Sequence, residues 1–329
     1  MMTRSICGWL VALVTLAPHS ANEWRDLGPQ PTGTRALVAE LSAQDPAARA
    51  RAACALRDLG DAAADAIEPL VKLLADGSPV DPTVCERRWW RGSGSDLTSP
   101  GEQAASALVA LGQRAFAPVF AALKQPAWVA RRNAAWALGA LDDQRAVQAL
   151  VDTLRDPEPP VREQAAWALG ALDDSAAVPA LVAALKDQDA RVRRQAAWAL
   201  GALDDARAVQ GLTDALNDAD EGTREQAAWA LGAIDQRSAV QPLARALADS
   251  SAGVRQQAAW ALGAIGDASA VDTLVKALND QSNGVREQAA WALGAIGDSR
   301  ALTGLLDALK DRDASVRKQA AWAIGAIGK

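Results

Sequence analysis

The chain has 329 residues, 50% of them apolar, and it carries a formal net charge of −6 with a pI near 5.0. Its acidic balance argues against binding of nucleic acid, because a phosphate backbone requires a basic stripe. The only histidine is His19, and no glycine-rich phosphate loop is present. We therefore expect no catalytic residues, no cofactor and no metal.

The first 21 residues have the pattern of a secretory signal peptide. Arg4 supplies a positive charge, residues 6–17 are apolar, and Ala21 ends a stretch of small residues suited to cleavage. The apolar segment is too short to span a bilayer, so no stable membrane insertion of the mature chain is expected. We predict an exported protein, periplasmic or secreted, followed by a linker over residues 22–31. The alternative is an N-terminal helix that begins the fold.

Residues 32–114 are predicted to form degenerate helical repeats interrupted by an inserted loop over residues 77–100. The insertion contains Arg88, Trp89 and Trp90. A cation beside aromatic rings is typical of binding hot spots. These residues are candidate partner contacts, or they fold back to cover the weak N-terminal repeats.

Two cysteines remain once a signal peptide is removed. Cys54 lies in a degenerate repeat and Cys85 lies in the insertion. In an exported protein such an even pair is a disulfide candidate, with two free thiols as the alternative.

Residues 115–329 repeat with a period of 31 residues, which predicts stacked supersecondary units rather than one globular core. Each unit has a first helix such as AVPALVAAL and a second helix such as VREQAAWALGAL. The loop between them places Asp or Ser at the expected N-cap of most second helices, while one unit has Glu158 followed by Pro159 in the first turn. Together with the degenerate part, the sequence predicts an all-α solenoid, a superhelix of about nine stacked antiparallel helix pairs.

One tryptophan stands at the same place in every regular second helix. With about 100° per residue, Trp167 lies about 150° from the middle of the stripe containing Val161 and Leu169. We predict that the indoles face away from the core and form a binding row, while Gly170 and its equivalents leave a notch in which each ring packs on the next repeat. The row consists of Trp136, Trp167, Trp198, Trp229, Trp260, Trp291 and Trp322.

Two charges also recur at fixed register. An arginine lies five residues before each tryptophan, and an aspartate lies eleven before it, except that the first unit has Gln125. A charge repeated in every unit predicts a structural ladder of paired side chains rather than an active site. The arginines are Arg131, Arg162, Arg193, Arg224, Arg255, Arg286 and Arg317, and the aspartates are Asp156, Asp187, Asp218, Asp249, Asp280 and Asp311.

The consensus D-x-x-x-x-V-R-x-Q-A-A-W-A-L-G-A-I-G-D, followed by A-V-x-x-L-x-x-A-L, resembles HEAT repeats of the short, phycobilisome-lyase-like type. The resemblance covers residues 115–329 strongly and 32–112 loosely. It implies a right-handed superhelix with the second helices on the concave face, and it implies that the chain holds another macromolecule. Related deoxyhypusine hydroxylases need His-Glu pairs that this chain lacks.

The leading hypothesis is a non-enzymatic scaffold that binds a peptide or protein segment along the concave tryptophan row. The alternatives are binding of cell-wall glycan by the same rings, and a purely structural spacer. The sequence ends at Lys329 after a repeat without a polar cap, which predicts end-to-end self-association unless the sequence is part of a longer array.

Overall fold

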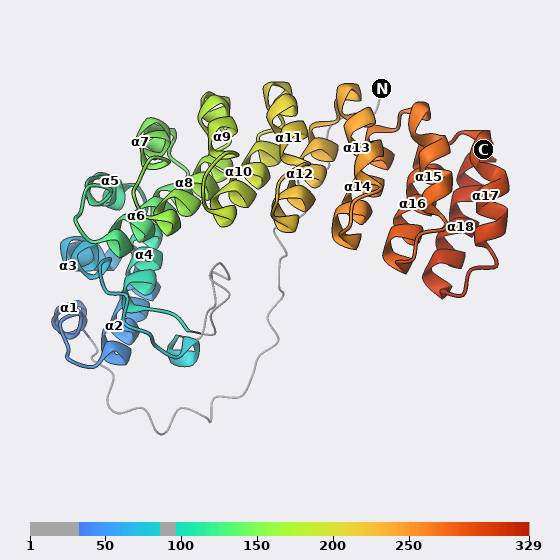
Figure 1. The fold of residues 1–329 in the computed structure, drawn as a ribbon. Helices are drawn as coiled ribbons and strands as arrows, with labels where there is room; N and C mark the ends of the chain where they lie inside the picture. The colour runs from blue at the N-terminus through green and yellow to red at the C-terminus, as the bar shows by residue number, and fades with distance from the viewer. Residues whose placement is uncertain (1–32, 86–96, 329) are drawn as a thin grey trace, which may run out of the picture.

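The computed structural model describes residues 33–85 and 97–328. Within them the chain forms nine consecutive helix pairs, stacked side by side into a curved solenoid (Figure 1). The β-type pairing found in these residues is limited to an isolated bridge between Val80 and Thr98. The predicted all-α solenoid is confirmed.

The first two pairs belong to the degenerate region. The insertion lies within the second pair, between its two helices, and contains a short 3-10 turn at Pro82–Val84. The helices are α1 (Thr34–Glu40), α2 (Pro46–Leu59), α3 (Ile67–Leu73) and α4 (Pro100–Ala110).

The remaining pairs are regular, with short first helices and longer second helices. The first helices are α5 (Phe116–Ala122), α7 (Val147–Thr153), α9 (Val178–Ala184), α11 (Val209–Ala215), α13 (Val240–Ala246), α15 (Val271–Ala277) and α17 (Leu302–Ala308). The second helices are α6 (Trp128–Ala140), α8 (Pro159–Ala171), α10 (Ala190–Ala202), α12 (Glu221–Ile234), α14 (Ala252–Ile265), α16 (Asn283–Ile296) and α18 (Ala314–Ile327).

The curvature follows from the residues on the second helices. A Cβ atom at Gly170 of α8 would lie 2.8 Å from the Ala199 Cα of α10, so these two helices are in backbone contact. The first helices carry larger side chains such as Leu181, which lies fully buried, and they pack mainly on their own partners. Because only the second helices approach closely, they form the inner, concave side and the first helices the outer side (Figure 1).

The ends of the second helices also follow a pattern. Four of them are followed by an aspartate in the left-handed region, at φ between 48° and 52°. Asp tolerates this conformation better than most residues, while Gly266 and Gly297 occupy it after α14 and α16. The four are Asp142, Asp173, Asp204 and Asp235.

Candidate functional site

The tryptophan row lies between neighbouring second helices. The rings from Trp136 to Trp291 are partly buried, and Trp322 is 49% exposed. Each ring from Trp167 onward lies on the glycine of the preceding repeat; Trp198 Cζ3, for example, is 2.9 Å from the place where a Gly170 Cβ would stand. Part of each ring therefore packs between repeats, and part stays accessible to a ligand.

The direction of this packing differs from the sequence expectation. We expected each ring to lie on the next repeat, but Trp167 lies on Gly139 of α6 and Trp322 lies on Gly294 of α16. Helical periodicity places the ring on the side of the helix but does not say which neighbour stands there. Ring packing also extends to a direct ring contact, since the Trp136 and Trp167 centroids are 6.4 Å apart with an interplanar angle of 16°.

The recurring arginines join adjacent repeats. Arg162 of α8 binds Asp187 of the next loop through two bonds, with Nε 2.7 Å from Oδ2 and Nη2 2.8 Å from Oδ1. Its third nitrogen, Nη1, donates to the Asp156 carbonyl in its own loop at 2.8 Å. One guanidinium therefore fixes two consecutive loops. The same bidentate pair occurs at Arg131–Asp156, Arg193–Asp218, Arg224–Asp249, Arg255–Asp280 and Arg286–Asp311.

The ladder aspartates also hold the starts of the second helices. Asp187 Oδ1 accepts the backbone N–H of Asp189, the N-cap of α10, at 2.8 Å. Ser251 and Ser282 stand at N-caps as expected, but their hydroxyls make no cap bond; instead their N–H groups donate to Asp249 and Asp280. These carboxylates are therefore occupied in structural contacts.

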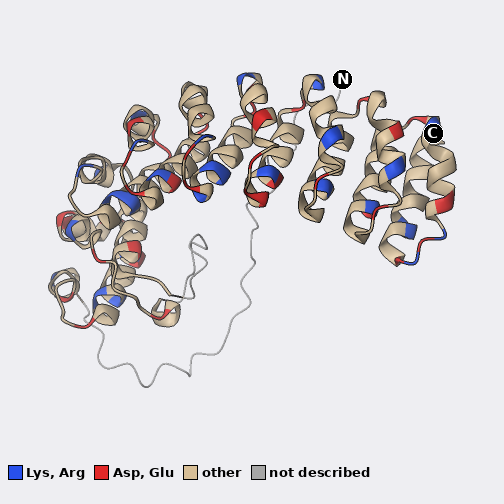
Figure 2. Cartoon of the chain, in the orientation of Figure 1, with Lys and Arg blue, Asp and Glu red and all other residues tan. Residues whose placement is uncertain are grey.

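Electrostatics of the ladder agree with this geometry. Burial alone would raise the pKa of Asp187, but the hydrogen bonds from Arg162 and from the Asp189 amide outweigh it and hold that pKa below its ordinary value. Around the solenoid, acidic and basic residues lie close to one another and no large field of one sign is seen (Figure 2). The arginine ladder thus joins consecutive loops of the solenoid through paired charges.

The first pair of this ladder was missed in the sequence-based prediction. Arg49 Nε lies 2.6 Å from Asp76 Oδ2, and Asp76 accepts the Ser78 N–H at 3.0 Å. The signal was present, because Arg49 lies five residues before Cys54, which occupies the tryptophan position of α2. The substitution of the tryptophan concealed the register.

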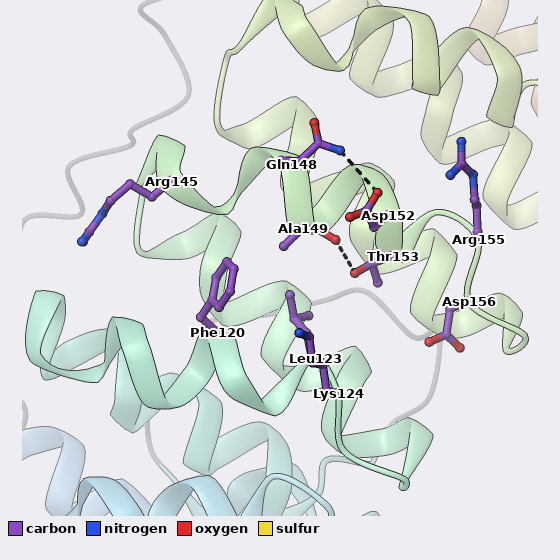
Figure 3. Close-up of a pocket in the computed structure, with 10 residues that line it drawn as sticks. All are labelled: Phe120, Leu123, Lys124, Arg145, Gln148, Ala149, Asp152, Thr153, Arg155 and Asp156. Atoms are coloured by element: carbon purple, nitrogen blue, oxygen red, sulfur yellow. Dashed lines mark hydrogen bonds between the residues drawn. The ribbon is translucent and has the colours of Figure 1, made fainter.

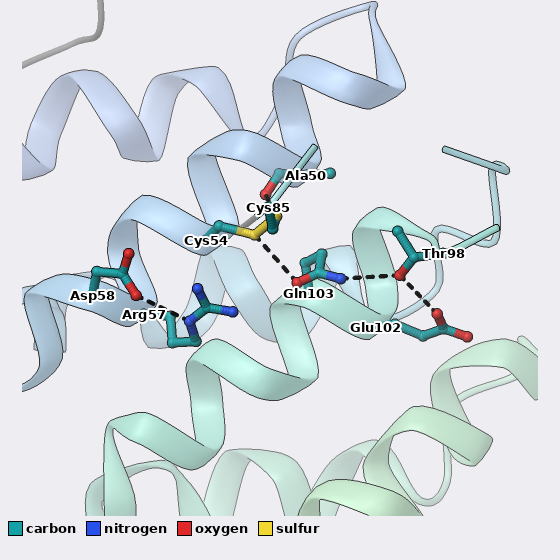
Figure 4. The surroundings of a disulfide bond; sticks show 8 residues. All are labelled: Ala50, Cys54, Arg57, Asp58, Cys85, Thr98, Glu102 and Gln103. Atoms are coloured by element: carbon teal, nitrogen blue, oxygen red, sulfur yellow. Dashed lines mark hydrogen bonds and ion pairs between the residues drawn. A yellow bond between two sulfur atoms is a disulfide. The ribbon is translucent and has the colours of Figure 1, made fainter. Parts of the chain in front are cut away.

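A disulfide joins Cys54 of α2 to Cys85 of the insertion, with a Cα–Cα distance of 6.2 Å (Figure 4). Both residues are buried. Beside them, Gln103 of α4 donates to Thr98 Oγ1 at 2.9 Å. The end of the insertion is therefore held against α4, while its middle is tied to α2. The predicted contacts Arg88, Trp89 and Trp90 lie outside the described residues.

A cavity of about 440 Å³ opens between α5 and α7, on the outer side of the solenoid (Figure 3). Phe120, Leu123 and Ala149 are among its lining residues, and basic side chains stand at its edge. Gln148 and Thr153 in its lining are already hydrogen-bonded to Asp152 and the Ala149 carbonyl. The cavity thus lies mainly on first helices, away from the tryptophan row.

Two further findings concern the described part of the chain. No set of three or more His, Cys, Asp or Glu side chains there is placed to hold a metal ion. None of its helices combines the length and apolar character needed to cross a membrane.

The fold and the repeated contacts define an α-solenoid built from short helix pairs. A family model described as HEAT repeats matches residues 102–162, 149–223, 178–256, 209–287 and 245–325. A second model, described as a PBS lyase HEAT-like repeat, matches residues 48–76. The chain belongs to the HEAT-repeat family, as its consensus predicted.

Solved structures share this architecture. Kap95p, in a complex with RanGDP, aligns with a TM-score of 0.67 and 16% identity over 89% of this chain and 47% of that one. YibA of E. coli aligns with a TM-score of 0.59 and 20% identity, covering 84% and 94%. An engineered protein aligns with a TM-score of 0.51 and 24% identity, covering 90% and 89%. These likenesses show the fold alone. A search of curated proteins finds no match.

Proposed function

We propose that this protein is a non-enzymatic scaffold that holds an extended peptide or protein segment along its concave face. The observation that carries the proposal is the tryptophan row. Large apolar rings recur at one register and each remains partly accessible, although from Trp167 onward a glycine notch receives the ring. Soluble proteins rarely leave a line of large apolar side chains partly accessible, and such surfaces commonly serve as binding sites.

Ring packing favours a peptide over a sugar. Stacking on a sugar requires a free flat face, whereas Trp136 and Trp167 already stack on each other. The glycine and alanine residues around the row supply few polar donors for sugar hydroxyls. A peptide groove tolerates accessible ring edges, so the row suits a peptide better than the glycan alternative.

We also propose that the protein acts in an exported compartment. The disulfide between Cys54 and Cys85 supports this, because structural disulfides persist mainly in oxidising surroundings. Residues 1–21, which carry the signal-peptide pattern, lie outside the described part of the chain. Labelling of free thiols in protein purified from the exported and cytoplasmic fractions tests the pairing directly.

The binding face is best tested without removing the rings, because they also pack between repeats. Ala171, Ala264 and Ala295 are exposed and lie one helical turn after Trp167, Trp260 and Trp291. Changing all three to Gln covers the accessible side of the row and leaves the glycine notches intact. The matched control changes Ala121 and Ala183, exposed on the first helices α5 and α9, to Gln.

Peptides selected from a randomised display library supply the ligands. We expect them to shift the tryptophan emission and to bind the concave variant at least about tenfold more weakly, while the control binds normally. Equal binding by both variants would remove the concave-face proposal. Binding of cell-wall glycan fragments with the same dependence would favour the carbohydrate alternative, and absence of any ligand would favour a spacer.

A further inference from the structure

Beside the tryptophan row, from α6 to α16, the basic side chains have partners within the protein and some of the acidic ones do not. Arginines near the row are already paired: Arg132 Nη2 lies 2.8 Å from Glu102, and Arg194 Nη2 lies 3.2 Å from Asp220. The ladder arginines are paired as well, up to Arg286. From α8 to α16, cations on the second helices therefore have their charge neutralised within the protein.

Three carboxylates next to the row have no such partner. Glu163, Glu225 and Glu287 lie four residues before Trp167, Trp229 and Trp291, on the same helix face. None of them forms an ion pair within 4.0 Å with another residue of the described ranges. All three are partly buried.

Two observations describe the surroundings of these carboxylates on the concave side. Glu225 Oε2 lies 2.8 Å from the place where a Gly253 Cβ would stand, so this side chain extends over the start of α14. Burial is the main cause that raises the pKa of Glu163; Asp189 raises it further, and Arg191, Arg194 and Arg132 lower it. A partly desolvated carboxylate without a partner is unfavourable, so a bound cation would stabilise it.

Within the part of the chain that the structure describes, cations on second helices without an ion pair lie outside α8–α16, as Lys318 of α18 does. Lys124, Arg155 and Lys186 are exposed just after the ends of the first helices α5, α7 and α9. The concave side from α8 to α16 is thus acidic in its unpaired charge, although the ribbon carries both signs (Figure 2). The excess of unpaired carboxylates on the concave side favours a positively charged ligand there.

We propose that the segment held on the concave face is basic, with arginine or lysine side chains that pair with Glu163, Glu225 and Glu287 and lie against the indoles. The inference rests on the proposed function and names the chemistry of its partner. The protein already makes such a contact internally, since the Arg132 guanidinium lies 5.7 Å from the Trp128 ring centroid.

The spacing of the carboxylates predicts the spacing of the cations. They stand on every second repeat, and packed helices are about 8–10 Å apart, so successive carboxylates are separated by roughly 16–20 Å. An extended chain advances about 3.3 Å per residue, which places basic residues about five or six positions apart.

The experiment uses the full chain and a synthetic peptide with three arginines, each separated by five Gly or Ser residues. Matched peptides carry Gln or Glu in place of the arginines. Glu163→Gln/Glu225→Gln/Glu287→Gln removes the concave carboxylates. Asp152→Asn/Asp214→Asn/Asp307→Asn changes the net charge equally, at exposed positions of the first helices. Binding is measured by calorimetry and tryptophan emission.

We expect the arginine peptide alone to bind the parent protein, with the concave variant about tenfold weaker and the first-helix variant within about twofold. Equal weakening of both variants would reduce the effect to net charge and overturn the inference. Binding of the Gln or Glu peptide as tight as that of the arginine peptide would also overturn it. If those peptides bind equally well but bind the Ala171→Gln/Ala264→Gln/Ala295→Gln variant weakly, the proposed function stands without a basic partner. If no peptide binds the parent protein, both the proposed function and the basic partner are wrong.

Discussion

The degenerate and the regular repeats fill the same inter-helix space with different residues. In the regular part, a large ring of one repeat lies on a glycine of the repeat before it. Between α2 and α4 the sizes are exchanged, because Arg57 occupies the glycine register of α2 and Ser106 the tryptophan register of α4. Arg57 is 9% exposed, so the larger side chain is accommodated. At this place the large side chain therefore comes from the preceding helix and the small one from the following helix.

The charge ladder shows a second contrast. At α4, Gly101 takes the place of the arginine and Gln125 takes the place of the aspartate, so both partners are missing together. A lone partner would leave a buried charge unpaired, which is far less favourable than losing the pair. Asn133 Nδ2, 2.9 Å from the Leu74 carbonyl, fills the space where an arginine would pass, since a Cβ at Gly101 would lie 2.7 Å from it. The N-terminal region thus replaces a repeated contact with single, local ones.

The largest expected effect concerns the disulfide. Cys54→Ser/Cys85→Ser opens a loop with a sequence separation of 31 residues. Restoring the chain entropy of such a loop costs about 3–4 kcal/mol of stability. Because repeats contact only their neighbours, we expect hydrogen exchange to accelerate in α2 and α4 and to stay unchanged in α10–α16. If hydrogen exchange accelerates equally along the whole chain, the disulfide does not stabilise the N-terminal repeats independently of the regular ones.

A slightly smaller effect is expected from breaking one pair of the ladder. The side chains of Arg193 and Asp218 are 14% and 12% exposed. Asp218→Asn leaves the Arg193 charge poorly compensated and should lower the free energy of unfolding by about 3 kcal/mol. Arg193→Gln/Asp218→Asn, which removes both charges as α4 does, should recover more than half of that loss in a double-mutant cycle. Additive losses would show that the two residues act independently.

The sequence specifies some of these contacts well and others poorly. The 31-residue period, with alanine on the second helices, determines the stacked pairs, and the fixed register of Arg162 and Asp187 makes their pairing visible. Which neighbour receives each ring depends on the handedness of the stack, which periodicity does not contain. Arg49–Asp76 was missed because Cys54 hides the repeat. The outer cavity depends on side chains such as Phe120 that follow no repeat.

The glycine notch supplies a comparison within one register. A Cβ at Gly263 would lie 2.6 Å from the Ala292 Cα, so Gly263→Ala must separate α14 from α16 and should destabilise by about 2 kcal/mol through overpacking. At Gly325, the equivalent residue of α18, no atom lies within 4 Å of the place where a Cβ would stand. There Gly325→Ala should stabilise by about 0.5–1 kcal/mol, because alanine is the better helix former. Denaturant midpoints measure both; equal effects would mean that the notch does not constrain packing.

The smallest expected effect is a dependence of stability on pH. The side-chain hydrogen bond from Arg191 lowers the pKa of Asp189 to about 2, below its ordinary value of 3.8. Because the folded-state pKa is the lower one, the stabilisation is fully present above about pH 4 and is lost as the pH falls toward 2. Arg191 is 55% exposed, so the contribution is at most about 1 kcal/mol.

The pKa of Glu163 is shifted in the opposite direction from that of Asp189, so the two residues should affect stability at opposite ends of the pH range. The Glu163 pKa is raised mainly by burial, so protonation favours the folded state, and its contribution is lost as the pH rises through the folded-state pKa. In urea titrations between pH 6 and about pH 3, Asp189→Asn should flatten the loss of stability in acid. Glu163→Gln should instead raise stability at neutral pH, because it removes an unpaired, partly desolvated charge. If Glu163→Gln lowers stability at neutral pH, that carboxylate has a partner within the protein, and the basic segment proposed for the concave face loses one of its three contacts.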